Sequence, residues 1–161
     1  MSSERPERLE LDGAGLKIAV ACSRFNHEVT GRLAAAAQAT LRRQGVDEDN
    51  ILLVECPGAF ELPLVAARLA RTGEFDAIIA LGAVIRGETD HYELVAKAAA
   101  EGIARVALDT GVPVIFGVLA ASTKDQAEAR AGGVLGNRGE DAALAAIEMA
   151  RLVAELARRA R

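Results

Sequence analysis

Four short apolar runs recur along the chain, separated by segments with helical periodicity. The runs are LKIAVAC (16–22), ILLVEC (51–56), AIIALGAVI (77–85) and VPVIFGVLA (112–120). Nearly continuous apolar runs of this length are typical of strands that are covered on both faces. The segments between them repeat apolar residues at three- and four-residue intervals, which predicts helices around 29–41, 62–69 and 95–106.

The residues after the fourth run predict two more helices. Thr123 and Gln126 have the spacing of a capping box, which predicts a short helix ending near Ala131. GGVLGNRG (132–139) is a glycine-rich connection, and a last amphipathic helix is expected over 140–161. This order of elements predicts an α/β fold, a three-layer sandwich with a four-stranded, mostly parallel sheet flanked by helices in a flavodoxin-like arrangement.

Length and composition favour one domain. The chain has 161 residues, of which 51% are hydrophobic, and this is enough to bury a sizeable core. We expect a polar N-terminal arm over 1–12 and a single domain over 13–161. The net charge is −4, and the Lys and Arg residues are scattered rather than gathered in a stripe, which argues against a nucleic-acid partner.

Membrane and secretion signals are not expected either. No apolar run reaches the roughly 18 residues that a membrane span requires, and the opening MSSERPERLELDG lacks the apolar stretch of a signal peptide. We therefore expect a cytoplasmic protein without a membrane partner. Cys22 and Cys56 each close an apolar run, which favours buried reduced thiols over a disulfide or a redox pair.

Chemically distinctive residues follow the predicted strands, where ligands of parallel α/β sheets bind. The four segments are SRFNHE (23–28), PGAFELP (57–63), RGETDHYE (86–93) and ASTKDQ (121–126). Phe25, Phe60 and Tyr92 lie just past a strand, and Phe116 lies within the fourth strand. In a chain with only 3% aromatic residues this placement favours a flat, ring-shaped ligand, and it equally fits side chains that cover the rim of the core.

The segment 86–93 combines groups that suit an anion. Gly87, Glu88 and Thr89 precede the expected start of a helix, so free N–H groups, the helix dipole and a hydroxyl can face one phosphate. The same residues also fit an ordinary turn with an N-cap. His91 is expected in the first helical turn, and an imidazole there suits proton transfer, although a lone histidine there is also common at a surface.

Three further charged residues are candidates. Glu61 opens the second helix, where it can accept hydrogen bonds from a ring or simply favour the helix N-terminus. Arg130 closes the short fourth helix and Arg138 lies in the glycine-rich connection; each fits an anion ligand or an ordinary surface arginine. No metal-ligand spacing, GxSxG, Walker A or GxGxxG motif occurs. The residues therefore predict an α/β protein that binds a planar, phosphorylated small molecule.

Seven blocks together resemble the 6,7-dimethyl-8-ribityllumazine synthase family, which catalyses the penultimate step of riboflavin biosynthesis. They are RFN (24–26), PGAFELP (57–63), GAVIRGETDHYE (82–93), VPVIFGVL (112–119), EARAG (128–132), GNRGED (136–141) and AIEMA (146–150). The blocks stand in the family order over residues 16–152. The resemblance implies a transferase without cofactor or metal that condenses 5-amino-6-(ribitylamino)uracil with 3,4-dihydroxy-2-butanone 4-phosphate, releasing phosphate and water.

The resemblance also implies which residues hold the first substrate. They are Phe25 and Phe116 against the pyrimidine, Ala59, Phe60 and Glu61 along the ribityl chain, and Ala83, Val84 and Ile85 through backbone hydrogen bonds to the ring. On the phosphate side it implies Glu88 and Thr89 as a binding pair, Arg130 as the charged ligand, and His91 as the proton-transfer residue.

Three positions depart from the family pattern. Many members carry lysine where this chain has Arg138, and since arginine does not give up a proton, only a secondary electrostatic role is expected there. Glu88 and Asp90 add carboxylates beside the expected phosphate, where many relatives have small or uncharged residues. We expect Glu88 to contribute its backbone N–H while its side chain turns to solvent.

The resemblance implies a homo-oligomer. The family forms pentamers, pairs of pentamers or icosahedral capsids of twelve pentamers, in which Phe116 and Arg130 reach the site of a neighbouring subunit. It also implies a partner, riboflavin synthase. The alternative is a non-catalytic flavin or lumazine carrier on the same fold, which would lack the phosphate and proton-transfer groups. Thr89, His91 and Arg130 are all present, which favours the enzyme.

Overall fold

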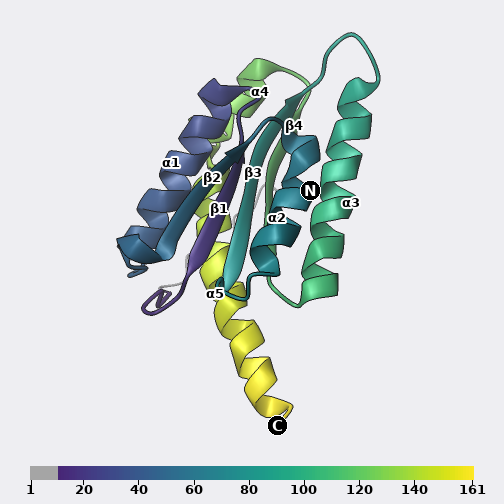
Figure 1. Cartoon of the computed structure of the whole chain (residues 1–161). Coiled ribbons are helices and arrows are strands. Elements are labelled where there is room, and N and C mark those ends of the chain that lie inside the picture. The colour runs from purple at the N-terminus through teal and green to yellow at the C-terminus, as the bar shows by residue number, and fades with distance from the viewer. Residues whose placement is uncertain (1–10) are drawn as a thin grey trace.

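The structure is a computed structural model that describes residues 11–161 (Figure 1). At its centre lies a four-stranded sheet of β1 (Ile18–Ser23), β2 (Ile51–Cys56), β3 (Ala77–Ile85) and β4 (Val114–Ala121). The strands lie in the order β2-β1-β3-β4, and every neighbouring pair is parallel. The sheet predicted to be mostly parallel is thus parallel throughout. The predicted polar arm lies, up to residue 10, outside the described residues.

Helices cover both faces of this sheet. On one face α1 (His27–Arg43) packs beside α5 (Arg138–Arg159), and on the other α2 (Leu62–Ala70) packs beside α3 (His91–Thr110). The predicted three-layer sandwich is confirmed. Figure 1 also shows the C-terminal part of α5 extending beyond the sheet.

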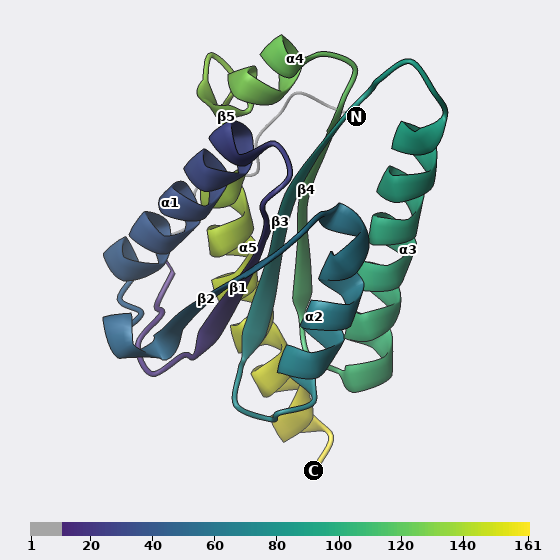
Figure 2. The same cartoon turned by 45° about the horizontal axis from the view of Figure 1, so that its top comes forward.

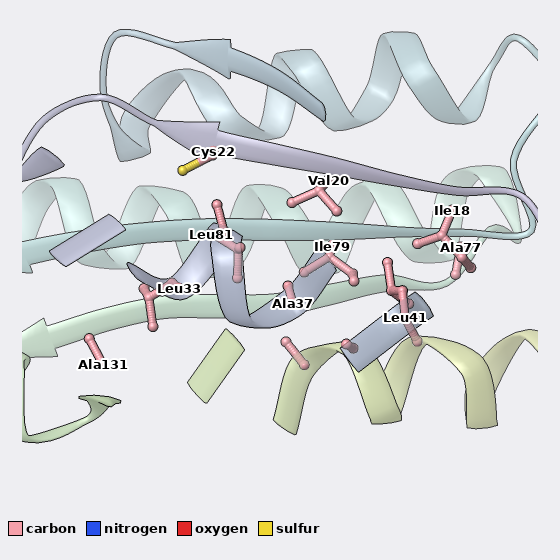
Figure 3. Close-up of a cluster of buried hydrophobic side chains, with 14 of the residues drawn as sticks. Ile18, Val20, Cys22, Leu33, Ala37, Leu41, Ala77, Ile79, Leu81 and Ala131 are labelled. Carbon is pink, nitrogen blue, oxygen red and sulfur yellow. The ribbon is translucent and has the colours of Figure 1, made fainter. Parts of the chain in front are cut away.

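The larger part of the core lies between the sheet and the α1 and α5 layer. Ile18 and Val20 of β1 and Ile79 of β3 have no exposed surface, and Leu33 and Leu41 of α1 pack against them (Figure 3). The intervening residues of β1 and β3 point to the opposite face, where they form separate clusters with α2 and α3. Apart from Ser23 at the end of β1, the two central strands are therefore apolar at every position, because both of their faces are covered.

The edge strand β2 departs from the prediction that all four runs are covered on both faces. Leu52 is 41% and Leu53 39% exposed in the isolated chain. A continuous apolar run does not distinguish a central strand from an edge strand, because both have the same local pattern. The sheet order decides the difference, since among residues 11–161 β2 pairs with β1 alone.

Several element boundaries differ from the predicted ones by two residues. β1 begins at Ile18 rather than residue 16, because Leu16 closes a turn by donating its N–H to the Gly13 carbonyl at 3.1 Å. The short helix α4 (Lys124–Ala129) ends before Ala131. The last helix begins at Arg138 rather than residue 140, because the Asn137 side chain caps it by accepting the Gly139 N–H at 2.8 Å.

The glycine-rich connection before α5 has more structure than predicted. It contains the two-stranded antiparallel pair β5 (Ala131–Gly133) and β6 (Gly136–Asn137). Two 3-10 turns, η1 (Glu48–Asn50) and η2 (Ala59–Glu61), precede β2 and α2. Figure 2 shows α4 and β5 at the same end of the sheet as the loop between β3 and α3.

The prediction for the two cysteines is confirmed: Cys22 and Cys56 are buried and not disulfide-bonded. Burial raises the pKa of both thiols, and that of Cys56 reaches about 11. Among the described helices, none is both long and apolar enough to span a membrane.

Candidate functional site

A pocket of about 590 Å³ lies at the carboxyl ends of β1, β2 and β3. Three of the four segments that follow the strands line it, together with the first two turns of α3. The lining residues are Phe25, Asn26, Gly58, Ala59, Phe60, Glu61, Ala83, Val84, Ile85, Gly87, Thr89, His91, Tyr92 and Val95. The structure thus brings together segments that are about 30 residues apart in the chain, because parallel strands all end at one edge.

The turn after β1 places an aromatic ring at the mouth of this pocket. Arg24 and Phe25 donate their backbone N–H groups to the carbonyls of Cys56 and Pro57, at 2.8 and 3.0 Å. These bonds tie the turn to the segment after β2. The Phe25 side chain is held on the outside of the turn, where 72% of it is exposed, so one ring face is available for stacking.

The segment after β2 forms a compact turn around Glu61. The carboxylate of Glu61 accepts the N–H of Gly58 at 3.0 Å, and the Gly58 carbonyl accepts the N–H of Glu61 at 3.2 Å. Ala59 is buried beneath this turn, whereas Phe60 is 62% exposed. A carboxylate can accept several hydrogen bonds, so Glu61 can hold the turn and still accept a bond from a ligand hydroxyl.

The third wall is the end of β3. Pairing with β1 stops at Leu81, whereas pairing with β4 continues to Ile85. On the side of the missing strand, the backbone from Ala83 to Ile85 borders the pocket. Backbone N–H and carbonyl groups at such an edge are directional partners for a planar heterocycle.

The loop from β3 to α3 brings the polar groups of the site. Residues 86–90 are exposed, and the Thr89 hydroxyl accepts the N–H of His91 over a long 3.4 Å. Asp90 is the N-cap residue, but its side chain makes no capping hydrogen bond. Since α3 is 20 residues long, the positive end of its dipole faces this region and favours a bound anion.

His91 and the residues behind it complete this side of the pocket. The imidazole of His91 is exposed and is free to meet a ligand, while Tyr92 and Val95 are partly buried and pack against the core beneath α2 and α3. Among the lining residues, Glu61, His91 and Tyr92 have side chains with acid–base groups, and the remaining lining is largely apolar. Such a site suits a ring with a few polar substituents.

Four predicted site residues do not line the pocket of a single chain. Phe116 lies on the edge strand β4 and is 48% exposed. Arg130 follows α4 and donates to the Gln126 carbonyl at 2.9 Å, and Arg138 pairs with Asp141 at 3.1 Å. Glu88 lies in the exposed loop without facing the pocket. A subunit neighbour supplying Phe116 and Arg130 therefore stays a prediction.

Sequence reasoning missed the site roles of Asn26 and Val95. Asn26 directly precedes a helix, where asparagine predicts an N-cap, and nothing in the sequence predicts its place in the pocket wall. Val95 was assigned only to the apolar face of α3, but it lies one turn after His91 and shares its face. Gly58 lines the pocket without a specific prediction for it, whereas Gly87 and Tyr92, named above as candidates for an anion and for a ring, do line it.

No three His, Cys, Asp or Glu side chains between residues 11 and 161 cluster in a way that could hold a metal ion.

In a comparison with known protein families, the model described as 6,7-dimethyl-8-ribityllumazine synthase matches residues 15–154. The matched range includes every lining residue of the pocket as well as Phe116, Arg130 and Arg138.

Proposed function

The chain belongs to the 6,7-dimethyl-8-ribityllumazine synthase family, and from this membership we propose that it condenses 5-amino-6-(ribitylamino)uracil with 3,4-dihydroxy-2-butanone 4-phosphate. The product would be 6,7-dimethyl-8-ribityllumazine, with release of phosphate and water. Family membership itself implies a transferase-type enzyme of riboflavin biosynthesis. The observation that most supports the specific reaction is that Phe25, Glu61 and His91 converge on one pocket.

The ring-binding half of the pocket suits the pyrimidine substrate. Stacking on the exposed Phe25 ring would hold the heterocycle flat, and the free backbone edge around Ala83 to Ile85 would bond its polar rim. The ribityl chain would run along the turn of Ala59 to Glu61, where the Glu61 carboxylate has lone pairs left for a hydroxyl.

The other half suits the phosphorylated ketone. Its phosphate would lie near Thr89 and the N-terminus of α3, where a hydroxyl and the helix dipole favour negative charge. Arg130 from a neighbouring subunit would supply the opposite charge. This arrangement directs the carbon skeleton of the ketone toward His91 and the stacked pyrimidine.

The chemistry requires no nucleophile from the protein. The 5-amino group of the pyrimidine attacks the ketone and loses water to give an imine; loss of a proton and expulsion of phosphate follow, and ring closure with loss of water completes the lumazine. His91 is placed to carry protons between these steps. Most of the rate enhancement would come from holding the two substrates in register.

The test is to incubate the purified protein with the two named substrates. Formation of the product is monitored by its absorbance near the visible range. We expect full activity in the presence of EDTA. Lack of product with both substrates present would disprove the proposed reaction, and tight lumazine binding without turnover would favour the carrier instead. Loss of activity on chelation would contradict the metal-free mechanism.

A further inference from the structure

Asn26 has an unusual backbone conformation at the edge of the pocket. Among residues 11–161 it is the one residue other than glycine with a positive φ, with φ 59° and ψ 47°. It is also the N-cap residue of α1, but its side chain makes no capping hydrogen bond. Its amide is therefore not explained by the usual use of asparagine at this position.

The amide of Asn26 instead reaches across to another strand. Its Nδ2 donates to the carbonyl oxygen of Ala83 at 2.8 Å, over a sequence separation of 57 residues. Only the nitrogen end of the amide can donate, so the acceptor sets its orientation. Glycine would adopt the left-handed backbone without steric cost, so the property that asparagine adds here is this bond.

The bond lies where the sheet has a gap. β1 stops pairing with β3 at Leu81, and Ala83 lies two residues beyond. The Asn26 side chain thus occupies the place that a continued β1 would have filled. It joins the turn that carries Phe25 to the backbone edge of Ala83 to Ile85. These are the two surfaces between which a flat ring would lie.

The turn has a second attachment that does not depend on a side chain. Phe25 donates its own N–H to the Pro57 carbonyl at 3.0 Å, which holds the turn toward β2 whatever residue follows. The distance between the Phe25 ring and β3 is restrained separately, by the Asn26 amide. Removing the amide would therefore loosen one wall of the pocket without detaching the turn.

We propose that Asn26 is a positioning residue for the ring-binding half of the pocket, because its amide bond to the Ala83 carbonyl sets the gap between the Phe25 ring and the edge of β3. This inference rests on the proposed function, which identifies the ring as a ribitylated pyrimidine or lumazine. The Asn26 amide attaches to Ala83 within β3, whereas Thr89 and His91 belong to the loop and helix that follow this strand, so the bond does not hold the phosphate region directly.

The experiment uses Asn26→Asp and Asn26→Gly in the full-length protein. Aspartate tolerates the left-handed backbone but presents an oxygen to the Ala83 carbonyl, and glycine keeps the backbone but removes the amide. We expect the Kd for 6,7-dimethyl-8-ribityllumazine, measured by its fluorescence, to rise about three- to tenfold, as for one lost hydrogen bond. The KM for the pyrimidine should rise in parallel, while the KM for the phosphorylated ketone stays within about twofold.

Gln38→Glu is the matched control, because it makes the same amide-to-carboxylate change on α1. Gln38 donates to the Ala34 carbonyl within its own helix, at 3.3 Å, so its Kd and KM values should equal those of the wild type. The Tm of each variant, measured by thermal unfolding, shows whether weaker binding results from a lost positioning bond or from a destabilised fold. If Asn26→Asp does not fold, the Kd and KM values of Asn26→Gly decide the test.

Two results would overturn the inference while leaving the proposed function intact. One is that the wild type is active and the Asn26 variants bind lumazine with the same Kd as the wild type. The other is an equal rise of both KM values with a lowered Tm, which would indicate a purely structural residue. A wild type that neither binds lumazine nor turns over the two substrates would instead disprove the proposed function, and this inference with it.

Discussion

His27 and His91 are each the first residue of a long helix, and both are exposed. Their surroundings differ. The His27 ring lies over Gly31 of its own helix, which leaves it outside the pocket, whereas His91 lines the pocket beside Tyr92. The residue type and helical position are thus the same, and only the placement of the helix separates a candidate catalytic histidine from a surface one.

This difference gives a matched pair of variants. We expect His91→Ala to lower kcat by about one to three orders of magnitude with little change in KM, as for loss of general acid-base catalysis. His27→Ala should leave both constants unchanged. Steady-state kinetics with each substrate varied in turn checks this, and an equal loss in both variants would remove His91 from the mechanism.

Arg130 should affect binding rather than proton transfer. Replacing it by alanine is expected to raise the KM for the phosphorylated ketone, because a charge-assisted contact to phosphate is lost, while kcat changes less. Arg105→Ala on α3, where the guanidinium pairs with exposed Asp109, is the control. Should Arg130→Ala and His91→Ala have the same kinetic pattern, the division of roles would be wrong.

The thiol of Cys56 should be nearly inert in the folded protein. With its pKa raised to about 11 by burial, about one molecule in a thousand carries the thiolate at pH 8, against about a quarter for an ordinary cysteine. Iodoacetamide should therefore alkylate Cys56 at least about 100-fold more slowly than in the denatured chain. Below this pKa the alkylation rate should rise about tenfold per pH unit. A rate that levels off above pH 9 would contradict the raised pKa of Cys56.

At the scale of elements, the position of α3 decides where His91 lies. α3 packs against α2 through a close approach at Gly102. A Cβ added at Gly102 would lie 2.5 Å from Cγ and 2.7 Å from Cβ of Pro63. The proline ring is rigid, so a larger residue at 102 would force the two helices apart.

Two glycine-to-alanine changes in helices should therefore have opposite signs. Gly31→Ala in α1 meets only the His27 ring, at 3.7 Å or more, and should raise the free energy of unfolding by about 0.5–1 kcal/mol through helix propensity. Gly102→Ala has the same propensity gain, but overpacking costs about 1–3 kcal/mol, so we expect lower stability. Chemical denaturation measures both, and stabilisation by Gly102→Ala would show that α3 adjusts freely.

At the scale of the whole molecule, two of the predicted site residues lie outside the pocket of the isolated chain. The pocket of one chain contains Phe25 and His91 but neither Phe116, which lies exposed on β4, nor Arg130, which follows α4. The exposed apolar residues Leu52 and Leu53 on the edge strand offer further contact surface. A head-to-tail ring, in which each subunit contributes one patch and receives the other, would complete the site.

Mixed oligomers test this arrangement. His91→Ala and Arg130→Ala homo-oligomers would each contain no intact site. When equal amounts are unfolded together and reassembled at random, roughly a quarter of the interfaces should join an intact His91 to an intact Arg130 from the next subunit. Activity should rise toward that fraction of wild type.

Sedimentation analysis gives the size of the assembly, and exchange of labelled subunits shows that mixing occurred. Activity that remains at the level of the parent variants, despite demonstrated exchange, would place both residues in the same chain. It would thereby exclude a site shared between neighbours.

Local sequence patterns determined most of the elements. The runs around Ile18 and Ile79 are apolar at consecutive positions, and the helices repeat every three to four residues, so strands, helices and a parallel sheet could be predicted from short-range order. Candidate residues of the site, such as Phe25 and His91, could be located because they directly follow predicted strands, and their chemical roles rested on family resemblance.

Only the tertiary structure decided which of these residues share a pocket. The bond from Asn26 to Ala83 depends on where β1 stops pairing with β3, and the exposure of Leu52 depends on the order of the strands. Phe116 lies on β4, at the other edge of the sheet from β2, and Arg130 follows α4, so neither lines the pocket. These relations join residues far apart in the chain, and no local periodicity or capping signal encodes a distance through space.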